Sequence, residues 1–318
     1  MKFKSNFKIT APSTITNIGC GLNIFGLAIS ALQDEIIVKP SNHPGVHITS
    51  IRNNSAKLPV SSKKNTAGTA AQLVLNHIKR EYNLDKSHGL SFELIKSIPI
   101  GLGLGSSAAS GVAGAIAVNE AFGNPLSKKE LLPFIIKGNL MTNTQACAIP
   151  AIASITGGLT LVRDENALEY HRMPVPKGLH VVVCHPISKT KKERQVRYNI
   201  ATSTALINSN LQTANAAALI HGLHTSNFDL ISKALKEQIT EDLWVNSFSF
   251  YKEAKESALL NNAICCSISN YGPTIFALCK SNIDAETVAE SIEKVFLNNN
   301  RALKVYISKV NQLGASLT

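Results

Sequence analysis

One stretch of the chain carries the residue types and spacing that most plainly suggest chemistry. Between positions 99 and 109 it reads Pro-Ile-Gly-Leu-Gly-Leu-Gly-Ser-Ser-Ala-Ala, so glycine recurs at every second position and two serines follow. Glycines leave the backbone without Cβ atoms, which allows its N–H groups to approach an anion, and the serine hydroxyls add further donors. We therefore predict a phosphate-binding loop. Its predicted contacts are Pro99, Ile100, Gly101, Leu102, Gly103, Leu104, Gly105, Ser106, Ser107, Ala108 and Ala109.

The elements on either side of this loop favour the same interpretation. Residues 90–97 alternate between apolar and polar as a strand does, and residues 108–122 form an apolar run of small residues without proline, which predicts a helix. The positive dipole end of that helix would point at the loop. The alternative is a plain glycine-rich turn between strand and helix. The spacing differs from the motifs G-x-x-x-x-G-K-[ST] and G-x-G-x-x-G, so the loop is of a third kind.

The loop resembles the nucleotide loop of the GHMP kinases, the family of galactokinase, homoserine kinase and mevalonate kinase, whose motif reads P-x-G-x-G-L-G-S-S-A-A. Further segments are most similar to homoserine kinases. They are Ala11–Asn17 with Gly21 and Gly26, Lys64–Gly68, Cys266–Ser269 with Gly272–Thr274, and Val305–Lys309. The resemblance covers nearly the whole chain. It implies ATP and Mg²⁺ as cofactors and a small alcohol, homoserine, as phosphate acceptor in threonine biosynthesis.

The resemblance also implies an α+β fold of two domains. Residues 1–177 would form the nucleotide-binding domain, an α/β part like domain 2 of ribosomal protein S5, and residues 178–318 a ferredoxin-like sandwich. In the second part, residues 263–268, 274–278 and 303–307 read as strands and helical patterns flank them. Antiparallel strands with helices on one face are typical of that sandwich. A chain of 318 residues is long enough for two domains.

The resemblance assigns binding roles to five positions outside the loop. Asn17 matches an asparagine that holds the amino-acid substrate in homoserine kinases, and Asn23 stands where that family has an aspartate. Arg194 matches an arginine that grips the substrate carboxylate, Gly272 lies in a turn near the substrate, and Asn65 occupies the corner that lies against the adenine. By residue type alone, Asn17 is a turn former, Asn65 a helix cap and Arg194 part of a solvated basic loop.

Several ligand positions of the family carry other residues here. Counting back without gaps from Gly157, the metal-binding glutamate falls on Asn139, and the motif H-A-D-N falls on residues 147–150, which read Cys-Ala-Ile-Pro. A second substrate-binding arginine falls on Trp244. Ser107 still offers Mg²⁺ a hydroxyl, but this cation prefers carboxylate oxygens, which Asn139 lacks. The nucleotide half of the site is therefore kept, whereas the metal and amino-acid half is eroded.

These departures leave three interpretations open. The first is a homoserine kinase of weak activity, preferred because the resemblance spans the chain; the second is a catalytically impaired nucleotide-binding or regulatory homologue; the third is a kinase for another small, less polar alcohol. A nucleic-acid-binding module is suggested only by the net charge of +11, from 32 Lys and Arg against 21 Asp and Glu. These lysines are scattered and form no basic stretch with interleaved aromatics, so we expect no nucleic acid partner.

Cysteine usage and hydropathy bear on location. The six cysteines include no C-x-x-C pair and mostly sit in apolar surroundings, as reduced, buried thiols do. No apolar run approaches the ~18 residues that span a bilayer, and the first residues lack an export signal. We expect a cytoplasmic protein with a small-molecule substrate and no membrane partner. The oligomeric state stays open, with a homodimer as one option.

Overall fold

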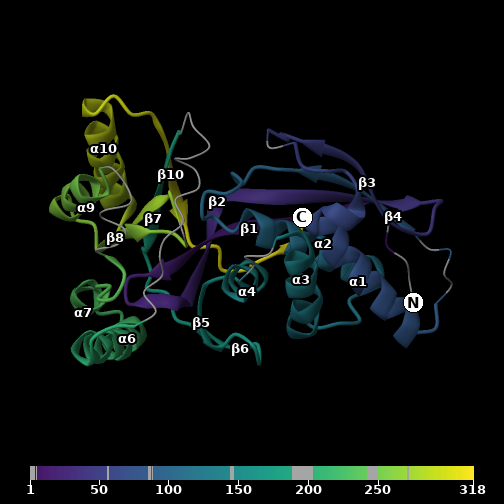
Figure 1. Cartoon of the computed structure of the whole chain (residues 1–318), viewed down its shortest axis with the longest axis horizontal. Coiled ribbons are helices and arrows are strands. Elements are labelled where there is room, and N and C mark those ends of the chain that lie inside the picture. The colour runs from purple at the N-terminus through teal and green to yellow at the C-terminus, as the bar shows by residue number, and fades with distance from the viewer. Residues whose placement is uncertain are drawn as a thin grey trace.

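The computed structural model describes residues 4, 6–55, 57–84, 87, 89–143, 147–187, 203–241, 250–270 and 272–318. These residues form a mixed α+β fold built on two β-sheets at opposite ends of the molecule (Figure 1). A hairpin of the first two strands reaches from the first sheet to the second. The predicted α+β class is confirmed.

The first sheet has seven strands, in the order β11-β1-β2-β4-β3, with β5 and β6 continuing from β2. The strands are β1 (Phe7–Ile18), β2 (Gly21–Ser41), β3 (Gly45–Arg52), β4 (Gly89–Ile95), β5 (Leu159–Asp164), β6 (Glu169–Met173) and β11 (Ser316–Leu317). The 21-residue β2 pairs with β4 along one half and with β5 along the other, so it carries the sheet toward the rest of the molecule.

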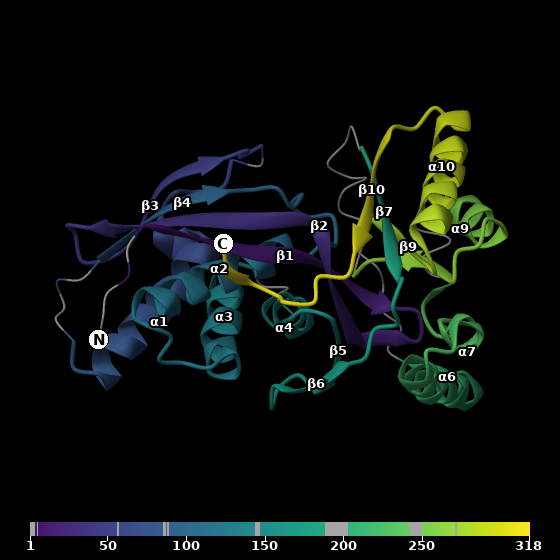
Figure 2. The ribbon, with the colours of Figure 1, turned by 180° about the vertical axis from the view of Figure 1, so that it is seen from behind.

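Four helices lie on one side of this sheet (Figure 2). They are α1 (Thr66–Glu81), α2 (Ser106–Ala121), α3 (Lys128–Thr142) and α4 (Ala148–Thr156), and a short 3-10 turn, η1 (Ser62–Lys64), precedes α1. Asn65 caps α1, and Ser127 with Glu130 forms a capping box on α3, as local patterns predict. Almost every residue of α2 is buried, because it packs against the sheet and between the other helices.

The second sheet is antiparallel, in the order β10-β7-β9-β8. Its strands are β7 (His180–Pro186), β8 (Cys265–Ile268), β9 (Ile275–Cys279) and β10 (Leu303–Lys309), and the helices of this part are α6 (Leu206–Thr225), α7 (Phe228–Ala234), α9 (Tyr251–Leu260) and α10 (Asn282–Asn298). Helices α9 and α10 share a core with one face of the sheet. In chain order the strands lie fourth, first, third, second, which is the predicted ferredoxin-like arrangement.

The C-terminal tail does not stay with the second sheet. After β10, Val310 forms a bridge with Ile29 of β2, and β11 pairs with β1 (Figure 2). One hydrophobic core contains residues from both sheets, from α1 to α4 and from α6 and α7. The division at residue 177 therefore stays a prediction, and the last residues belong spatially to the first sheet.

The segment between positions 17 and 26, in which the sequence places Gly21 and Gly26, forms part of a β-hairpin. Strand β1 continues to Ile18 and β2 begins at Gly21, which leaves only Gly19 and Cys20 in the turn. Almost all of β1 is buried, since the hairpin packs against α4, β5 and the second sheet. A strand buried on both faces lacks the alternation that reveals a strand in sequence.

The six cysteines are free thiols, all buried except the half-buried Cys147, as their apolar surroundings predict. Within the part of the chain that the structure describes, no helix is both long and apolar enough to cross a membrane.

The close contact of α2 with α1 gives a test of this packing. A Cβ at Gly114 would lie 2.2 Å from the carbonyl oxygen of Ala67, so we expect Gly114→Ala to lower the free energy of unfolding by about 1–3 kcal/mol. Gly111→Ala in the same helix is the control, because its nearest neighbour would lie 3.3 Å away and alanine favours a helix by ~1 kcal/mol. Urea unfolding of the two variants decides, and equal stabilities would contradict the packing.

Candidate active site

The predicted phosphate loop joins the end of β4 to the start of α2. Gly101, Gly103 and Gly105 have φ values of 75°, 80° and 68°, a region that glycine adopts without strain. Gly105 is the N-cap of α2, and the first N–H groups of a helix have no partner within it. The loop therefore runs directly into the N-terminus of α2, the arrangement that the sequence pattern predicts.

The three glycines have different surroundings, which the sequence pattern does not distinguish. A Cβ at Gly101 would meet nothing within 4 Å, so the backbone there faces open space. A Cβ at Gly103 would lie 2.3 Å from the carbonyl oxygen of Ser269, and one at Gly105 would lie 2.2 Å from Oγ1 of Thr14. The expectation that all three open the backbone to an anion stays a prediction, because a Cβ contact does not fix where an N–H group points. At Gly103 and Gly105 the missing Cβ makes room for protein atoms.

Two hollows of about 220 and 230 Å³ open beside the loop. The larger is lined by Pro99, Ile100, Gly101, Gly103, Leu104, Gly105, Ser106, Ser107, Ala108, Asn139, Asn143, Cys147, Pro150 and Asn270. The smaller is lined by Leu58, Lys64, Asn65, Thr66, Lys96, Ile100, Ser106, Ser107, Ser110, Thr142 and Asn143. The first turn of α2 belongs to both. Leu102 and Ala109, predicted as contacts, line neither hollow, and both side chains are buried.

Ser107 stands in a group of hydroxyl and amide side chains between three helices. Its Oγ donates to Oδ1 of Asn139 at 2.5 Å and lies 3.2 Å from Oγ1 of Thr66, which in turn lies 2.7 Å from Oγ1 of Thr142. Asn139 comes from α3 and is 3% exposed. The fold thus brings together Ser107 and Asn139, the hydroxyl and the glutamate replacement that the sequence pairs as a metal site.

This group does not suit Mg²⁺. No Asp or Glu is among the residues that line the two described hollows, and no three His, Cys, Asp or Glu side chains of the described ranges gather as ligands. Mg²⁺ is usually held through carboxylates, and the hydroxyl of Ser107 donates its hydrogen to Asn139.

A carboxylate nearby, that of Glu165, accepts from the N–H of Ala148 at the start of α4, beside Cys147. Burial, with Glu165 alongside, raises the pKa of that thiol to about 12.

Asn17 acts as a brace, meaning that its side-chain amide links the β1–β2 hairpin to the turn after β8 of the second sheet by hydrogen bonds. Its Nδ2 donates to the carbonyl oxygen of Asn270 and its Oδ1 accepts from the N–H of Asn23, each at 3.0 Å, and it is 2% exposed. The backbone N–H of Gly272 donates to Ser269 in the same turn at 2.8 Å. Both amide ends of Asn17 are thus used inside the protein, which fits its interpretation as a turn former. The side chain of Asn23 is exposed.

The remaining predicted positions divide in two. Asn65 lines the smaller hollow, but its Oδ1 accepts from the N–H of Ala67 at 3.1 Å and its Nδ2 donates to the carbonyl oxygen of Pro59 at 3.0 Å. Its side chain therefore shapes the corner, and a contact with adenine stays a prediction. Arg194 and Trp244 lie outside the described residues.

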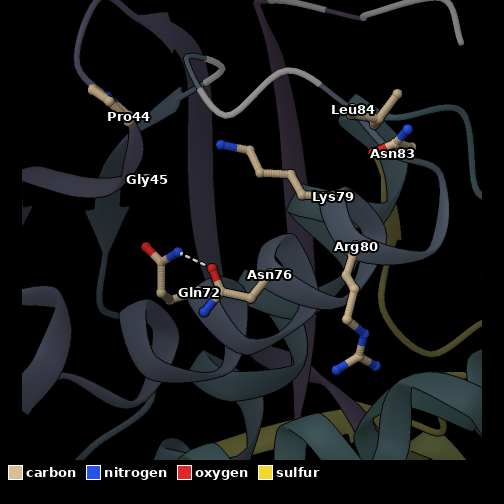
Figure 3. A pocket seen from close by; sticks show the side chains of 8 residues that line it. All are labelled: Pro44, Gly45, Gln72, Asn76, Lys79, Arg80, Asn83 and Leu84. Carbon is tan, nitrogen blue, oxygen red and sulfur yellow. Dashed lines mark hydrogen bonds between the residues drawn. The ribbon is translucent and has the colours of Figure 1, made fainter.

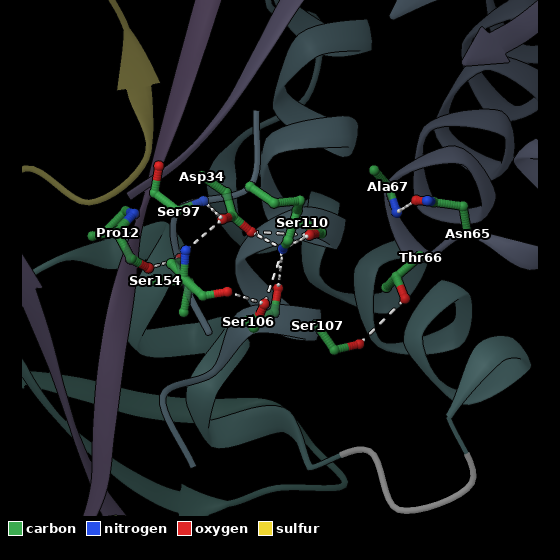
Figure 4. A network of polar contacts seen from close by, with 12 residues as sticks. Pro12, Asp34, Asn65, Thr66, Ala67, Ser97, Ser106, Ser107, Ser110 and Ser154 are labelled. Atoms are coloured by element: carbon green, nitrogen blue, oxygen red, sulfur yellow. Dashed lines mark hydrogen bonds and ion pairs between the residues drawn. The ribbon is translucent and has the colours of Figure 1, made fainter. Parts of the chain in front are cut away.

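The sequence pattern does not predict a buried ion pair that lies beneath the loop, in the polar network around Asp34 (Figure 4). Lys96, just after β4, pairs with Asp34 of β2, and their side chains are 4% and 3% exposed. The Lys96 ammonium also donates to Oγ of Ser110 at 2.7 Å and of Ser106 at 2.9 Å. Oδ1 of Asp34 accepts from two backbone N–H groups after β4, at 3.0 and 3.1 Å. A lysine directly after an apolar strand indicates a buried charge that needs a partner. That partner, Asp34, stands 62 positions earlier, so the local pattern does not identify it.

A wider hollow, of about 630 Å³, lies along the C-terminal half of α1 (Figure 3). It is lined by Pro44, Gly45, Gln72, Asn76, Lys79, Arg80, Asn83 and Leu84. Gln72 accepts from the N–H of Val46 at 2.9 Å and donates to Asn76 at 2.8 Å, and Arg80 pairs with Glu81. None of the residues that line it belongs to the phosphate loop, so we place the candidate site at the opposite end of α1.

Known proteins resemble this chain along nearly its whole length. Residues 65–158 match the family described as the GHMP kinases N terminal domain. A homoserine kinase from Chlorobium phaeovibrioides is 34% identical over 96% of this chain and 98% of its own, and one from Chlorobaculum tepidum is 32% identical over 96% of both. The chain belongs to the homoserine kinase family of the GHMP kinases.

Solved structures of GHMP kinases share the fold. The crystal structure of homoserine kinase from Cytophaga hutchinsonii superposes with a TM-score of 0.89 at 33% identity, covering 99% of this chain and 98% of that one. Mevalonate kinase from Methanococcus jannaschii has a TM-score of 0.71 at 15% identity over 96% of this chain and 98% of its own, a likeness of fold alone. The GHMP kinase resemblance seen in the sequence is confirmed.

The brace at Asn17 predicts a loss of stability on substitution. Asn17→Ala leaves the N–H of Asn23 and the carbonyl of Asn270, in two part-buried hydrogen bonds, without their partner, which costs about 1–3 kcal/mol in the free energy of unfolding. Asn53→Ala is the matched control, since Asn53 has φ 56° against 61° for Asn17 but is exposed. Denaturant titration of both variants measures the difference. A loss no larger than that of the control would show that Asn17 is not a brace.

Proposed function

We propose that this chain is an ATP-dependent phosphotransferase of homoserine kinase type, which moves the γ-phosphate of ATP to the side-chain hydroxyl of L-homoserine. The observation that carries the proposal is the loop itself, whose backbone and helix N-terminus face two hollows beside α2. Backbone N–H groups and the positive helix end bind phosphate. Two full-length relatives named homoserine kinase support the acceptor. We also propose a cytoplasmic location.

In this proposal the nucleotide lies along the start of α2. Its phosphates contact Gly101 and the first-turn residues Ser106 and Ser107, and its adenine lies toward Asn65. The acceptor lies toward the turn that contains Gly272, on the side of the loop where Asn270 lines the larger hollow. Phosphoryl transfer depends mainly on positioning and charge neutralisation, so these contacts carry most of the protein's part.

Two acceptor contacts rest on the resemblance. Arg194 would hold the acceptor carboxylate, and the exposed Asn23 would face its ammonium group with a neutral amide. Asn17 acts on the acceptor only through the turn that it braces.

Weak turnover follows from the side chains around Ser107. Mg²⁺ with ATP would supply neutralisation of the transferring phosphate, but Asn139 offers it an amide where the family offers a carboxylate. We therefore propose a slow kinase. The second candidate is a nucleotide-binding regulatory homologue without turnover, which the same Asn139–Ser107 contact favours. A kinase for a less polar alcohol is favoured by the neutral Asn23.

Nucleotide binding at the loop can be tested at Gly101. We expect Gly101→Val to weaken the affinity for ATP at least about tenfold, because its side chain would enter the open space before the loop. Gly123→Val is the matched control: Gly123 has φ 82°, close to the 75° of Gly101, and also has nothing within 4 Å. Calorimetric titration with ATP compares the variants. Equal affinities would contradict the loop assignment.

The acceptor and the metal can be tested together. We expect the wild type to phosphorylate homoserine slowly in a coupled assay, and Asn139→Asp, which keeps the shape and adds a carboxylate beside Ser107, to raise turnover and the affinity for ATP in the presence of Mg²⁺ only. Asn53→Asp adds the same charge on an exposed loop and should change neither. Fast turnover by the wild type would refute the weak-activity proposal. ATP binding without any transfer would leave the regulatory candidate.

A further inference from the structure

We infer that the buried pair of Asp34 and Lys96 holds both ends of the phosphate loop at a fixed separation, and that Asp34 is a positioning residue for nucleotide binding although it lines neither hollow. The inference rests on the proposed nucleotide site. It concerns Asp34, which lines neither hollow, together with Lys96, Ser106 and Ser110, which line the smaller hollow.

The first end of the loop is held by Asp34. Its Oδ1 accepts from the backbone N–H groups of Ser97 and Ile98, at 3.0 and 3.1 Å, immediately before the loop begins at Pro99. Asp34 itself lies within the long strand β2, opposite Ala11 of β1. The start of the loop is thereby fixed to the centre of the first sheet.

The second end is held by Lys96. Its ammonium donates to Oγ of Ser106 and of Ser110, in the first two turns of α2, and to the carboxylate of Asp34, so its three hydrogens all have acceptors. Each serine hydroxyl also donates a hydrogen bond of its own. Ser106 donates to the carbonyl oxygen of Ile98 at 3.0 Å, and Ser110 donates to Oδ2 of Asp34 at 3.1 Å. Residues 99–105 therefore span two points tied to one charge pair.

The charges themselves argue for a role in positioning. A buried ion pair contributes little net stability compared with apolar residues of the same volume, but it fixes geometry through directed hydrogen bonds. A lone lysine at a helix N-terminus would also be repelled by the positive end of the dipole. Asp34 cancels the charge of Lys96, which leaves the dipole of α2 and the N–H groups of its first turn available to a phosphate group.

The same chain offers a matched control pair. Lys255 and Glu241 also form an ion pair, with side chains 26% and 22% exposed, in the part of the molecule that holds the second sheet. Neither residue lines the hollows beside the loop. A variant without this pair therefore shows how the loss of a charge pair changes the stability of the fold when the loop itself is untouched.

The experiment compares Asp34→Asn and the double variant Asp34→Asn/Lys96→Met with Glu241→Gln. ATP affinity is measured by calorimetry, and amide hydrogen exchange over residues 99–110 is followed in the protein without nucleotide. We expect both loop variants to bind ATP at least about tenfold more weakly and to exchange faster over the loop. Glu241→Gln should leave both quantities unchanged, even where it lowers the melting temperature.

The outcomes separate the inference from the proposed function. Wild-type affinity with unchanged loop exchange in a folded Asp34→Asn variant would overturn the inference. If Asp34→Asn alone does not fold, because Lys96 is left as an unpaired buried charge, the double variant decides by its loop exchange, since Lys96 lines the smaller hollow and its replacement also changes the surface that faces ATP. If the wild type itself binds no ATP, the proposed function fails, and loop exchange in the same variants still decides whether the pair holds the loop.

Discussion

The site depends on one constraint: the glycine loop must stay open toward a ligand while its other side is held in place. Three contacts hold that side. Ser269 donates through Oγ to the carbonyl oxygen of Gly103 at 2.6 Å, Thr14 donates through its N–H to that of Leu104 at 3.1 Å, and the buried pair of Asp34 and Lys96 fixes the two ends. A loop of flexible residues binds a ligand well only if its entropy has already been lost in the folded protein.

These contacts tie the two sheets together as well. Thr14 belongs to β1, whereas Ser269 follows β8 in the second sheet, so the loop is clamped between them. Asn17 closes the same junction by its bond to Asn270. A movement of the second sheet would therefore move the wall of the larger hollow that Asn270 lines. In the proposed arrangement the nucleotide and the acceptor share that wall, which is a reason for a hairpin buried on both faces.

Local signals account for the parts of the site that the sequence predicts. The loop, the start of α2 and the cap at Asn65 depend on residues a few positions apart, and the structure has all three. What fills the space behind Gly103 and Gly105 depends on residues from distant segments, so the pattern alone cannot separate these glycines from Gly101. The pattern does not predict the ion pair of Lys96 for the same reason. The hairpin is not evident in the sequence, because burial on both faces removes the period of two.

The neutral surroundings of Ser107 bear on binding and on rate in different ways. At the proposed site the phosphates of ATP would meet the N–H groups of α2 and its dipole, and Lys64 lines the same hollow, so the ground state would keep its main contacts. The charge that shifts during transfer needs stabilisation that is stronger in the transition state, and Asn139 brings no charge to it. We therefore expect the proposed replacement of one acid by an amide to lower the rate more than the affinity. At this site, a slow kinase and a regulatory nucleotide binder would differ only in how much transition-state stabilisation has been lost.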